Sequence, residues 1–303
     1  MTLPNFLIIG AAKSGSTSLY NYLGQHSQIY VIQKKEPGFF AFEGQNVEFA
    51  GPGDQERYGS KVVSDLNAYQ SLFKDAADAM AVGEASIVYL YNPKAPTRIK
   101  HYIPEVKFIA ILRNPVDRAF SSFAFLTSEG REPLKVFVQA LQVEETRVNA
   151  NWEHQWHYTR LGFYYSQLKR YFDLFHPDQI AVYTYDEFSA KPVVVLQDIF
   201  RFLGVDHTFI PDTSFQYNVS GMPNSRALRN FIVKSSKVKN ILNLFFPSPL
   251  RQRMVRKAMQ LNTRKIKPTF SEETRLYLTQ LYQDEILKLQ SLIQKDLSKW
   301  LVT

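Results

Sequence analysis

The stretch FLIIGAAKSGST at residues 6–17 decides the fold class of this chain. Its first four residues form an apolar run that predicts a buried strand, and residues 18–23 (SLYNYL) place apolar side chains on one face of a helix. A loop between a buried strand and a helix start offers unpaired backbone N–H groups and the positive end of the helix dipole. Lys13 adds a positive charge, while Ser16 and Thr17 add hydroxyl donors. The sequence therefore predicts a phosphate-binding loop, and an ordinary tight turn is the alternative.

The loop departs from the form that binds nucleoside triphosphates, which reads Gly-x-x-x-x-Gly-Lys-Ser/Thr. Two glycines have that spacing, but Ser16 stands where the lysine belongs, and Lys13 comes three residues earlier. The strand expected at 107–113 ends in Arg113 rather than in the aspartate that such proteins use to hold magnesium. Both departures count against a kinase or ATPase, which stays a distant alternative.

Short apolar runs and helix-like segments alternate along the rest of the chain. We expect strands at 29–31, 82–86, 107–113 and 180–185, and helices after Pro115, over 192–203 up to Gly204, and from about Ser271 onward. The last helix has one apolar stripe, formed by Leu278, Tyr282, Ile286, Leu289 and Ile293. This alternation predicts an α/β fold with a P-loop-like central parallel β-sheet flanked by helices. We find no composition break, so residues 1–303 are expected to form a single domain.

Charge is unevenly distributed in this 303-residue chain, whose net charge is +8. Twelve Lys and Arg and no acidic residue lie between Asp212 and Glu272. This basic segment is either a solvated face or a clamp for a polyanion such as a nucleotide, a nucleic acid or an acidic membrane surface. A non-catalytic polyanion-binding module therefore stays an alternative to an enzyme.

Cysteine is absent, which excludes disulfides, thiolate metal sites and a cysteine nucleophile. Every apolar run is far shorter than the roughly 20 residues that a membrane-spanning helix needs. The first apolar run has no preceding basic residue and does not read as a signal peptide. We therefore expect a cytoplasmic protein without a membrane span.

Two blocks of sequence carry a resemblance to a known family. Residues 13–17 (KSGST) resemble the 5′-phosphosulfate loop of the sulfotransferases that use 3′-phosphoadenosine 5′-phosphosulfate (PAPS), and residues 113–121 (RNPVDRAFS) are similar to the 3′-phosphate block of that family. Residues 35–40 (KEPGFF) and 218–226 (NVSGMPNSR) extend the likeness, which is closest to the bacterial and heparan sulfate branch. A structural arginine at a sheet edge is the alternative role for Arg113.

The resemblance implies the residues that bind the nucleotide and perform the reaction. Its nucleotide-binding residues are Lys13, Ser14, Gly15, Ser16, Thr17, Arg113, Ser121, Ser220, Gly221 and Arg226. It also implies that Glu36 is the general base and that Lys13 stabilises the leaving phosphate, although a surface glutamate is the alternative for Glu36. PAPS is then the cosubstrate, and neither the chemistry nor the spacing of His and carboxylates calls for a metal.

Two positions depart from the family pattern. Gly38 stands where family members often have histidine, and Ala85 stands where heparan-type enzymes carry a second catalytic lysine. Lys34 or Lys35 is a candidate source of the missing charge. These departures weaken the case for a polysaccharide substrate more than the case for the reaction.

The acceptor side is the least defined part of the sequence. Candidate acceptor-binding residues are Lys35, Phe39, Trp152, Trp156 and His157, of which His157 is also the reserve candidate for the base. Ordinary aromatic packing is the alternative for residues 152–158. We expect a small-molecule acceptor with a hydroxyl or amine, such as an alkaloid or another specialised metabolite, with a carbohydrate or glycolipid as the alternative. We expect no nucleic-acid partner, and the sequence does not indicate an oligomeric state.

Overall fold

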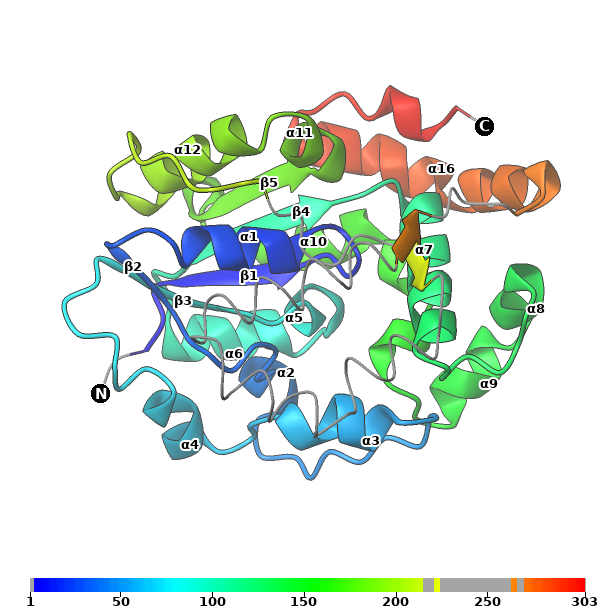
Figure 1. Ribbon diagram of the computed structural model, residues 1–303, viewed down its shortest axis with the longest axis horizontal. Coiled ribbons are helices and arrows are strands. Elements are labelled where there is room, and N and C mark those ends of the chain that lie inside the picture. Colours follow the sequence, from blue (N-terminus) through cyan, green and yellow to red (C-terminus); the bar gives the residue numbers. More distant parts are fainter. Residues whose placement is uncertain (1–2, 215–220, 224–262, 266–269, 303) are drawn as a thin grey trace, which may run out of the picture.

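Five parallel strands form the central sheet in the computed structural model of the protein, which describes residues 3–214, 221–223, 263–265 and 270–302 (Figure 1). Their order across the sheet is β2 (Ile29–Val31), β3 (Ala81–Ala85), β1 (Phe6–Gly10), β4 (Lys107–Leu112) and β5 (Ile180–Thr184). After β1 the chain runs to the edge strand β2, returns with β3 to the place between β2 and β1, and then crosses to β4 on the other side of β1. Ligands of open parallel sheets bind where the order reverses in this way, beyond the carboxyl ends of the strands.

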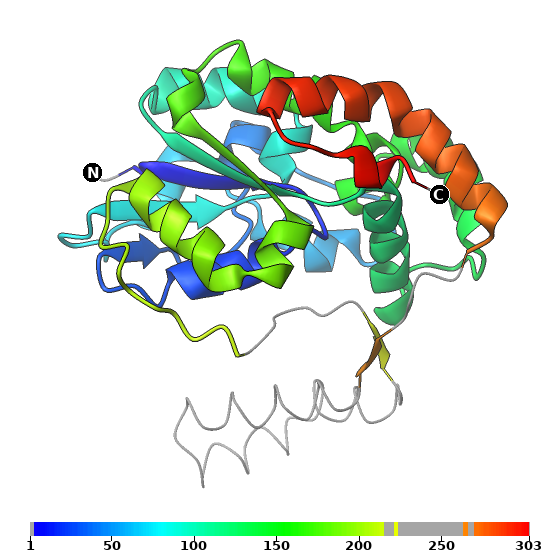
Figure 2. The same cartoon turned by 90° about the horizontal axis from the view of Figure 1, so that it is seen from above.

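The two faces of the sheet are covered by different helices, because side chains along each strand alternate between the faces. Phe6 and Ile8 of β1 pack on one face, and Leu7 and Ile9 pack on the other. The helices on the face of Phe6 are α1 (Ser16–Leu23), α11 (Tyr185–Ala190) and α12 (Pro192–Leu203). The opposite face contributes to a larger core with α2 (Phe39–Phe42), α5 (Val88–Tyr91), α6 (Ala95–Tyr102), α7 (Pro115–Ser128), α8 (Phe137–Gln142), α10 (Tyr164–Phe172) and α16 (Glu272–Ile293). Figure 2 shows α12 and α16 on opposite sides of the sheet.

The remaining elements are short. They are α3 (Asp54–Arg57), α4 (Leu66–Ser71), α9 (Glu144–Asn149) and the 3₁₀ turns Gly59–Lys61, His154–Trp156, Arg160–Gly162, Pro177–Gln179 and Ser298–Trp300. A two-stranded antiparallel ladder joins β6 (Gly221–Pro223) to β7 (Thr263–Lys265), and β6 lies beside α7. Most of the basic segment lies outside the described residues.

Helix ends follow the local signals in the sequence. The Asn114 side chain accepts a hydrogen bond from the Val116 N–H at 2.9 Å, and Pro115 occupies the first helical position of α7. Ser271 caps α16 in the same way, and Gly204 ends α12 with φ +80°. The predicted strands, helices and parallel sheet are confirmed. The apolar stripe of α16 is confirmed as well, because four of its five residues, Leu278, Tyr282, Ile286 and Leu289, are buried. Within the described ranges, no helix is both long and apolar enough to cross a membrane.

Candidate active site

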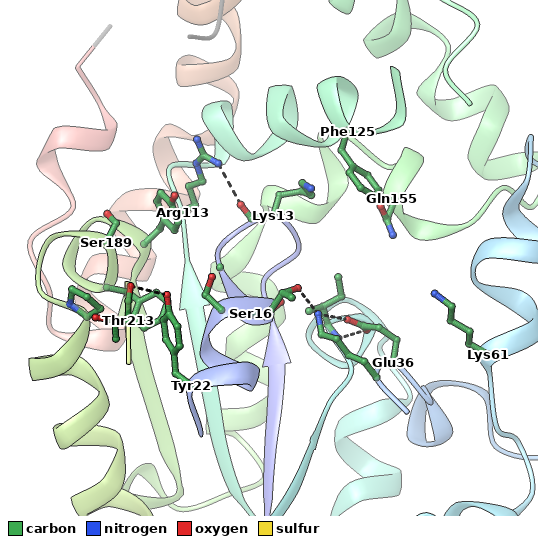
Figure 3. A pocket seen from close by; sticks show the side chains of 18 residues that line it. Lys13, Ser16, Tyr22, Glu36, Lys61, Arg113, Phe125, Gln155, Ser189 and Thr213 are labelled. Carbon is green, nitrogen blue, oxygen red and sulfur yellow. Dashed lines mark hydrogen bonds and ion pairs between the residues drawn. The ribbon is translucent and has the colours of Figure 1, made fainter. Parts of the chain in front are cut away.

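A cavity of about 310 Å³ lies at the carboxyl ends of the strands (Figure 3). The predicted residues that line it are Lys13, Gly15, Ser16, Thr17, Lys35, Glu36 and Arg113. They come from the segments that follow β1, β2 and β4. Figure 3 shows Lys13 and Ser16 in the middle, Arg113 toward one end, and Glu36 with Lys61 toward the other. Among the described residues, the charged lining comprises four cations and one carboxylate, so the cavity is suited to an anion.

The loop after β1 presents the start of α1 to this cavity. Gly15 has φ +97°, a conformation that side chains rarely adopt, and an added Cβ would lie 3.4 Å from the rings of Tyr185 and Phe188. Ser16 and Thr17 begin the helix, where backbone N–H groups have no partner within the helix itself. Ser14 differs from the prediction in one respect: its side chain is fully buried and is not part of the lining.

Lys13 sits at the centre of the cavity with a perturbed ammonium group. Its Nζ lies 3.9 Å from the centroid of the Phe125 ring, which attracts a cation through its quadrupole. Burial, followed by the positive charge of Arg113, lowers the pKa of Lys13 to about 7. Its backbone has φ +62°, a conformation that costs on the order of 1–3 kcal/mol for a residue other than glycine. An incoming anion would restore the charge that burial disfavours.

Arg113 lines the cavity toward the end opposite Glu36 (Figure 3). Its Nη1 donates to the Lys13 carbonyl at 3.4 Å, and its guanidinium lies 4.9 Å from the Tyr185 ring centroid. Ser121 lies on α7 but is buried and does not line the cavity. Only the backbone of Gly221 is described, in β6 beside α7. Ser220 and Arg226 lie outside the described residues, so the predicted 3′-phosphate site is only partly visible.

Glu36 lies at the other end, held by the connection between β3 and α5. Its Oε2 accepts a hydrogen bond from the Ile87 N–H at 2.9 Å, and its own N–H donates to the Ala85 carbonyl at 3.0 Å. The Gly38 N–H donates to Ser86 Oγ at 3.0 Å. Glu36 has φ +62°, as Lys13 does. Both predicted catalytic residues therefore share a strained backbone conformation of the kind that gathers at functional sites.

The buried carboxylate of Glu84 stabilises the connection between β3 and α5. Glu84 accepts hydrogen bonds from the Tyr89, Ser86 and Tyr69 hydroxyls at 2.6, 2.9 and 3.1 Å. Burial raises the pKa of Glu84 to about 7, although these hydrogen bonds oppose the shift. Because the Ser86 hydroxyl donates to Glu84, its oxygen is free to accept from Gly38, which fixes the chain beside Glu36.

Two of the aromatic candidates for acceptor binding, Phe39 and Trp156, lie in the core of the structure. Phe39 is fully buried and stacks on Tyr69 with ring centroids 4.6 Å apart. Trp156 is also fully buried, and its Nε1 donates to Asp54 at 2.8 Å. Neither side chain lines the cavity, so both belong to the core rather than to an acceptor contact. Aromatic side chains near a site motif look alike in sequence whether they pack inward or face a ligand.

Trp152 and His157 also lie away from the cavity lining. Trp152 is half-buried and packs edge-on against Trp156. His157 Nδ1 lies 2.9 Å from the Tyr91 hydroxyl. Burial, followed by the charge of His154, lowers the pKa of His157 to about 4, so this imidazole is neutral. Its position gives no support to a role as the base.

Several residues that line the cavity were not predicted from the sequence. They are Ser18, Tyr22, Lys61, Ile87, Phe125, Gln155, Tyr185, Phe188, Ser189, Pro192 and Thr213. Tyr185 follows β5 directly, so its place at a strand's carboxyl end was a usable signal. Lys61, Gln155 and Thr213 come from distant loops and carry no such signal. Among the described residues, no group of three or more His, Asp and Glu is placed to hold a metal ion.

The chain is similar to several known proteins. Residues 4–209 match the model of a family described as the sulfotransferase family. A solved sulfotransferase from Alicyclobacillus acidocaldarius has a TM-score of 0.77, 34% identity, and coverage of 99% of both chains. The bifunctional heparan sulfate N-deacetylase/N-sulfotransferase 1 of Caenorhabditis briggsae is 25% identical over 231 residues, which are 74% of this chain and 24% of that protein. The bifunctional heparan sulfate N-deacetylase/N-sulfotransferase 3 of Mus musculus is 27% identical over 208 residues, which are 67% of this chain and 22% of that protein. The chain thus spans about a quarter of the length of these curated relatives.

Proposed function

The chain belongs to the sulfotransferase family, and from this premise we propose that it transfers the sulfuryl group of PAPS to a hydroxyl or amine of a small-molecule acceptor. The observation that carries this proposal is the joining of the Lys13–Thr17 loop and Glu36 in one cation-rich cavity. Such a cavity suits a doubly phosphorylated nucleotide better than it suits a neutral ligand.

The reaction assigns one task to each end of the cavity. The acceptor oxygen or nitrogen attacks sulfur, Glu36 takes its proton, and the bond from sulfur to the bridging oxygen breaks. The electron pair stays on that oxygen, where the Lys13 ammonium neutralises the charge that develops. The N-terminal turn of α1 binds the 5′-phosphate, and Arg113 binds the 3′-phosphate with its planar fork of donors. No step requires a metal ion.

The acceptor class rests on the residues around Glu36. Heparan-type enzymes carry a lysine where this chain has Ala85, which favours an acceptor different from theirs. The likeness to heparan sulfate N-sulfotransferases favours a saccharide amine or hydroxyl as the second candidate. We propose a small metabolite first, because of this difference at Ala85; the residues that line the cavity next to the proposed base include Lys61 and Gln155.

A comparison of two donor substrates, PAPS and ATP, distinguishes the proposed sulfuryl transfer from phosphoryl transfer by a kinase. The purified protein is incubated with an extract of its source organism and either labelled PAPS or labelled ATP, with and without a chelator. We expect transfer from PAPS that the chelator does not reduce, and a product whose mass has increased by one SO₃. Transfer from ATP that requires a divalent cation would overturn the proposal in favour of a kinase.

A further inference from the structure

The Lys35 ammonium lies between the nucleotide loop and the proposed base. Its Nζ donates to Thr17 Oγ1 at 2.7 Å and lies 3.4 Å from Glu36 Oε1. Its side chain is 26% exposed and lines the cavity, so it is accessible to a ligand. A cation in this place contacts both the nucleotide loop and the base of the proposed reaction.

The neighbouring strand supplies no cation here. Ala85 ends β3, is fully buried, and pairs with Ile8 of β1. Its carbonyl accepts the hydrogen bond from the N–H of Glu36. The segment that carries Lys35 is therefore bound directly to the position where heparan-type enzymes place a lysine on their own strand.

The other cations near the cavity are placed less well for this role. Lys61 is exposed and lies beyond Glu36, on the side away from Lys13 and Ser16 (Figure 3). Lys34, although adjacent in sequence, does not line the cavity. Arg113 lies toward the opposite end, next to the Lys13 carbonyl. Lys35 is thus the cavity cation that contacts both the loop and the base in the part of the chain that the structure describes.

We propose that Lys35 is a second catalytic cation, which contacts the sulfuryl group during transfer and replaces the lysine missing at Ala85. The proposal rests on the proposed function. As sulfur passes from the bridging oxygen of PAPS to the acceptor, negative charge spreads over the sulfuryl oxygens and the leaving oxygen. The Lys35 ammonium stabilises that charge, while Glu36 alone takes the acceptor proton. Because Lys35 also forms an ion pair with Glu36, it would hold the base close to the sulfuryl group.

The absence of native cysteine allows a selective test of this charge. Lys35→Cys removes the ammonium, and alkylation with 2-bromoethylamine rebuilds a lysine-like side chain at that one position. Lys34→Cys, treated identically, is the matched control. Two quantities are measured: PAP affinity by calorimetry, and release of label from radiolabelled PAPS to water or to acceptors in an extract. Circular dichroism checks that each variant is folded.

We expect Lys35→Cys to lose about 100-fold in turnover, as when one donor to a developing oxyanion is removed, with PAP affinity changed only a few-fold. Alkylation should restore most of the turnover, and Lys34→Cys should match the wild type before and after treatment. Wild-type turnover in Lys35→Cys, or a folded, alkylated variant that binds PAP but stays slow, would overturn the role of Lys35. A wild-type protein that binds no PAP and releases no label would instead contradict the proposed function itself.

Discussion

The charge of Lys13 is expected to make the affinity for the nucleotide depend on pH between about pH 7 and pH 9. Burial and the nearby Arg113 lower the pKa of the Lys13 ammonium to about 7 in the free protein. A bound phosphate or phosphosulfate would favour the charged form and raise this pKa toward its ordinary range. The affinity for the nucleotide is therefore highest below pH 7, where Lys13 is charged in the free protein. It falls as the pH rises from 7 toward the pKa that Lys13 has in the complex.

The size of the effect follows from that difference in pKa. Each pH unit above the free-state pKa lowers the charged fraction of Lys13 about tenfold, which corresponds to about 1.4 kcal/mol. With a free-state pKa of about 7, about half of the Lys13 side chains are charged at pH 7 and roughly 1% at pH 9, so the dissociation constant of PAP should rise roughly 50-fold over this range. The phosphates of the nucleotide have their second pKa near 6, so they contribute little to the change over this range.

Calorimetric titrations of PAP at several pH values measure the effect directly. Titrations in two buffers with different heats of ionisation should show uptake of close to one proton per nucleotide near pH 8. Lys13→Arg keeps the charge but cannot lose its proton, so its PAP affinity should vary little over the same range. A wild-type affinity that stays constant from pH 7 to 9, or the same pH dependence in Lys13→Arg, would refute this reasoning.

Three further substitutions test separate parts of the site. Glu36→Gln should lower turnover by about 100-fold or more, the usual contribution of a general base, while PAP affinity stays nearly unchanged; a large loss of affinity would remove its role as base. Arg113→Ala should weaken binding of PAP more than binding of adenosine 5′-phosphosulfate, which lacks the 3′-phosphate, and equal losses would refute the 3′-phosphate assignment. Ser86→Ala removes the partner of the Gly38 N–H and a donor to Glu84, so we expect a loss of about 1–3 kcal/mol in denaturant unfolding together with a lower kcat. Unchanged values of both quantities would show that this hydrogen bond does not position the base.

The fold was predictable because its signals are local. The apolar run at residues 6–9, the glycine at position 15 and the proline at position 115 each report on a few neighbouring residues. The parallel orientation of the strands, although not their order, then follows from the rule that strands alternating with helices form a parallel sheet. The Lys13–Thr17 loop and Arg113 were predictable for the same reason, since each directly follows a strand that an apolar pattern identifies.

The acceptor side was not predictable because it depends on contacts between distant segments. The hydrogen bond between Lys35 and Thr17 joins two loops that follow different strands. Gln155 reaches the cavity from the segment before α10, whereas its neighbour Trp156 points into the core. A sequence pattern cannot separate these two orientations in a stretch without regular periodicity. The left-handed backbone of Glu36 is equally invisible in sequence, because tertiary contacts rather than residue type impose it.

The central claim is that one cavity binds a nucleotide phosphorylated at both its 3′ and 5′ positions. Calorimetric titration of the full chain at pH 7 with PAP, and in parallel with adenosine 5′-monophosphate, tests it most directly. We predict saturable binding of one PAP per chain and much weaker binding of the monophosphate, since the cations gathered around Lys13 and Arg113 serve two anionic groups. Equal affinity for both nucleotides, or no heat of binding with PAP, would contradict the account.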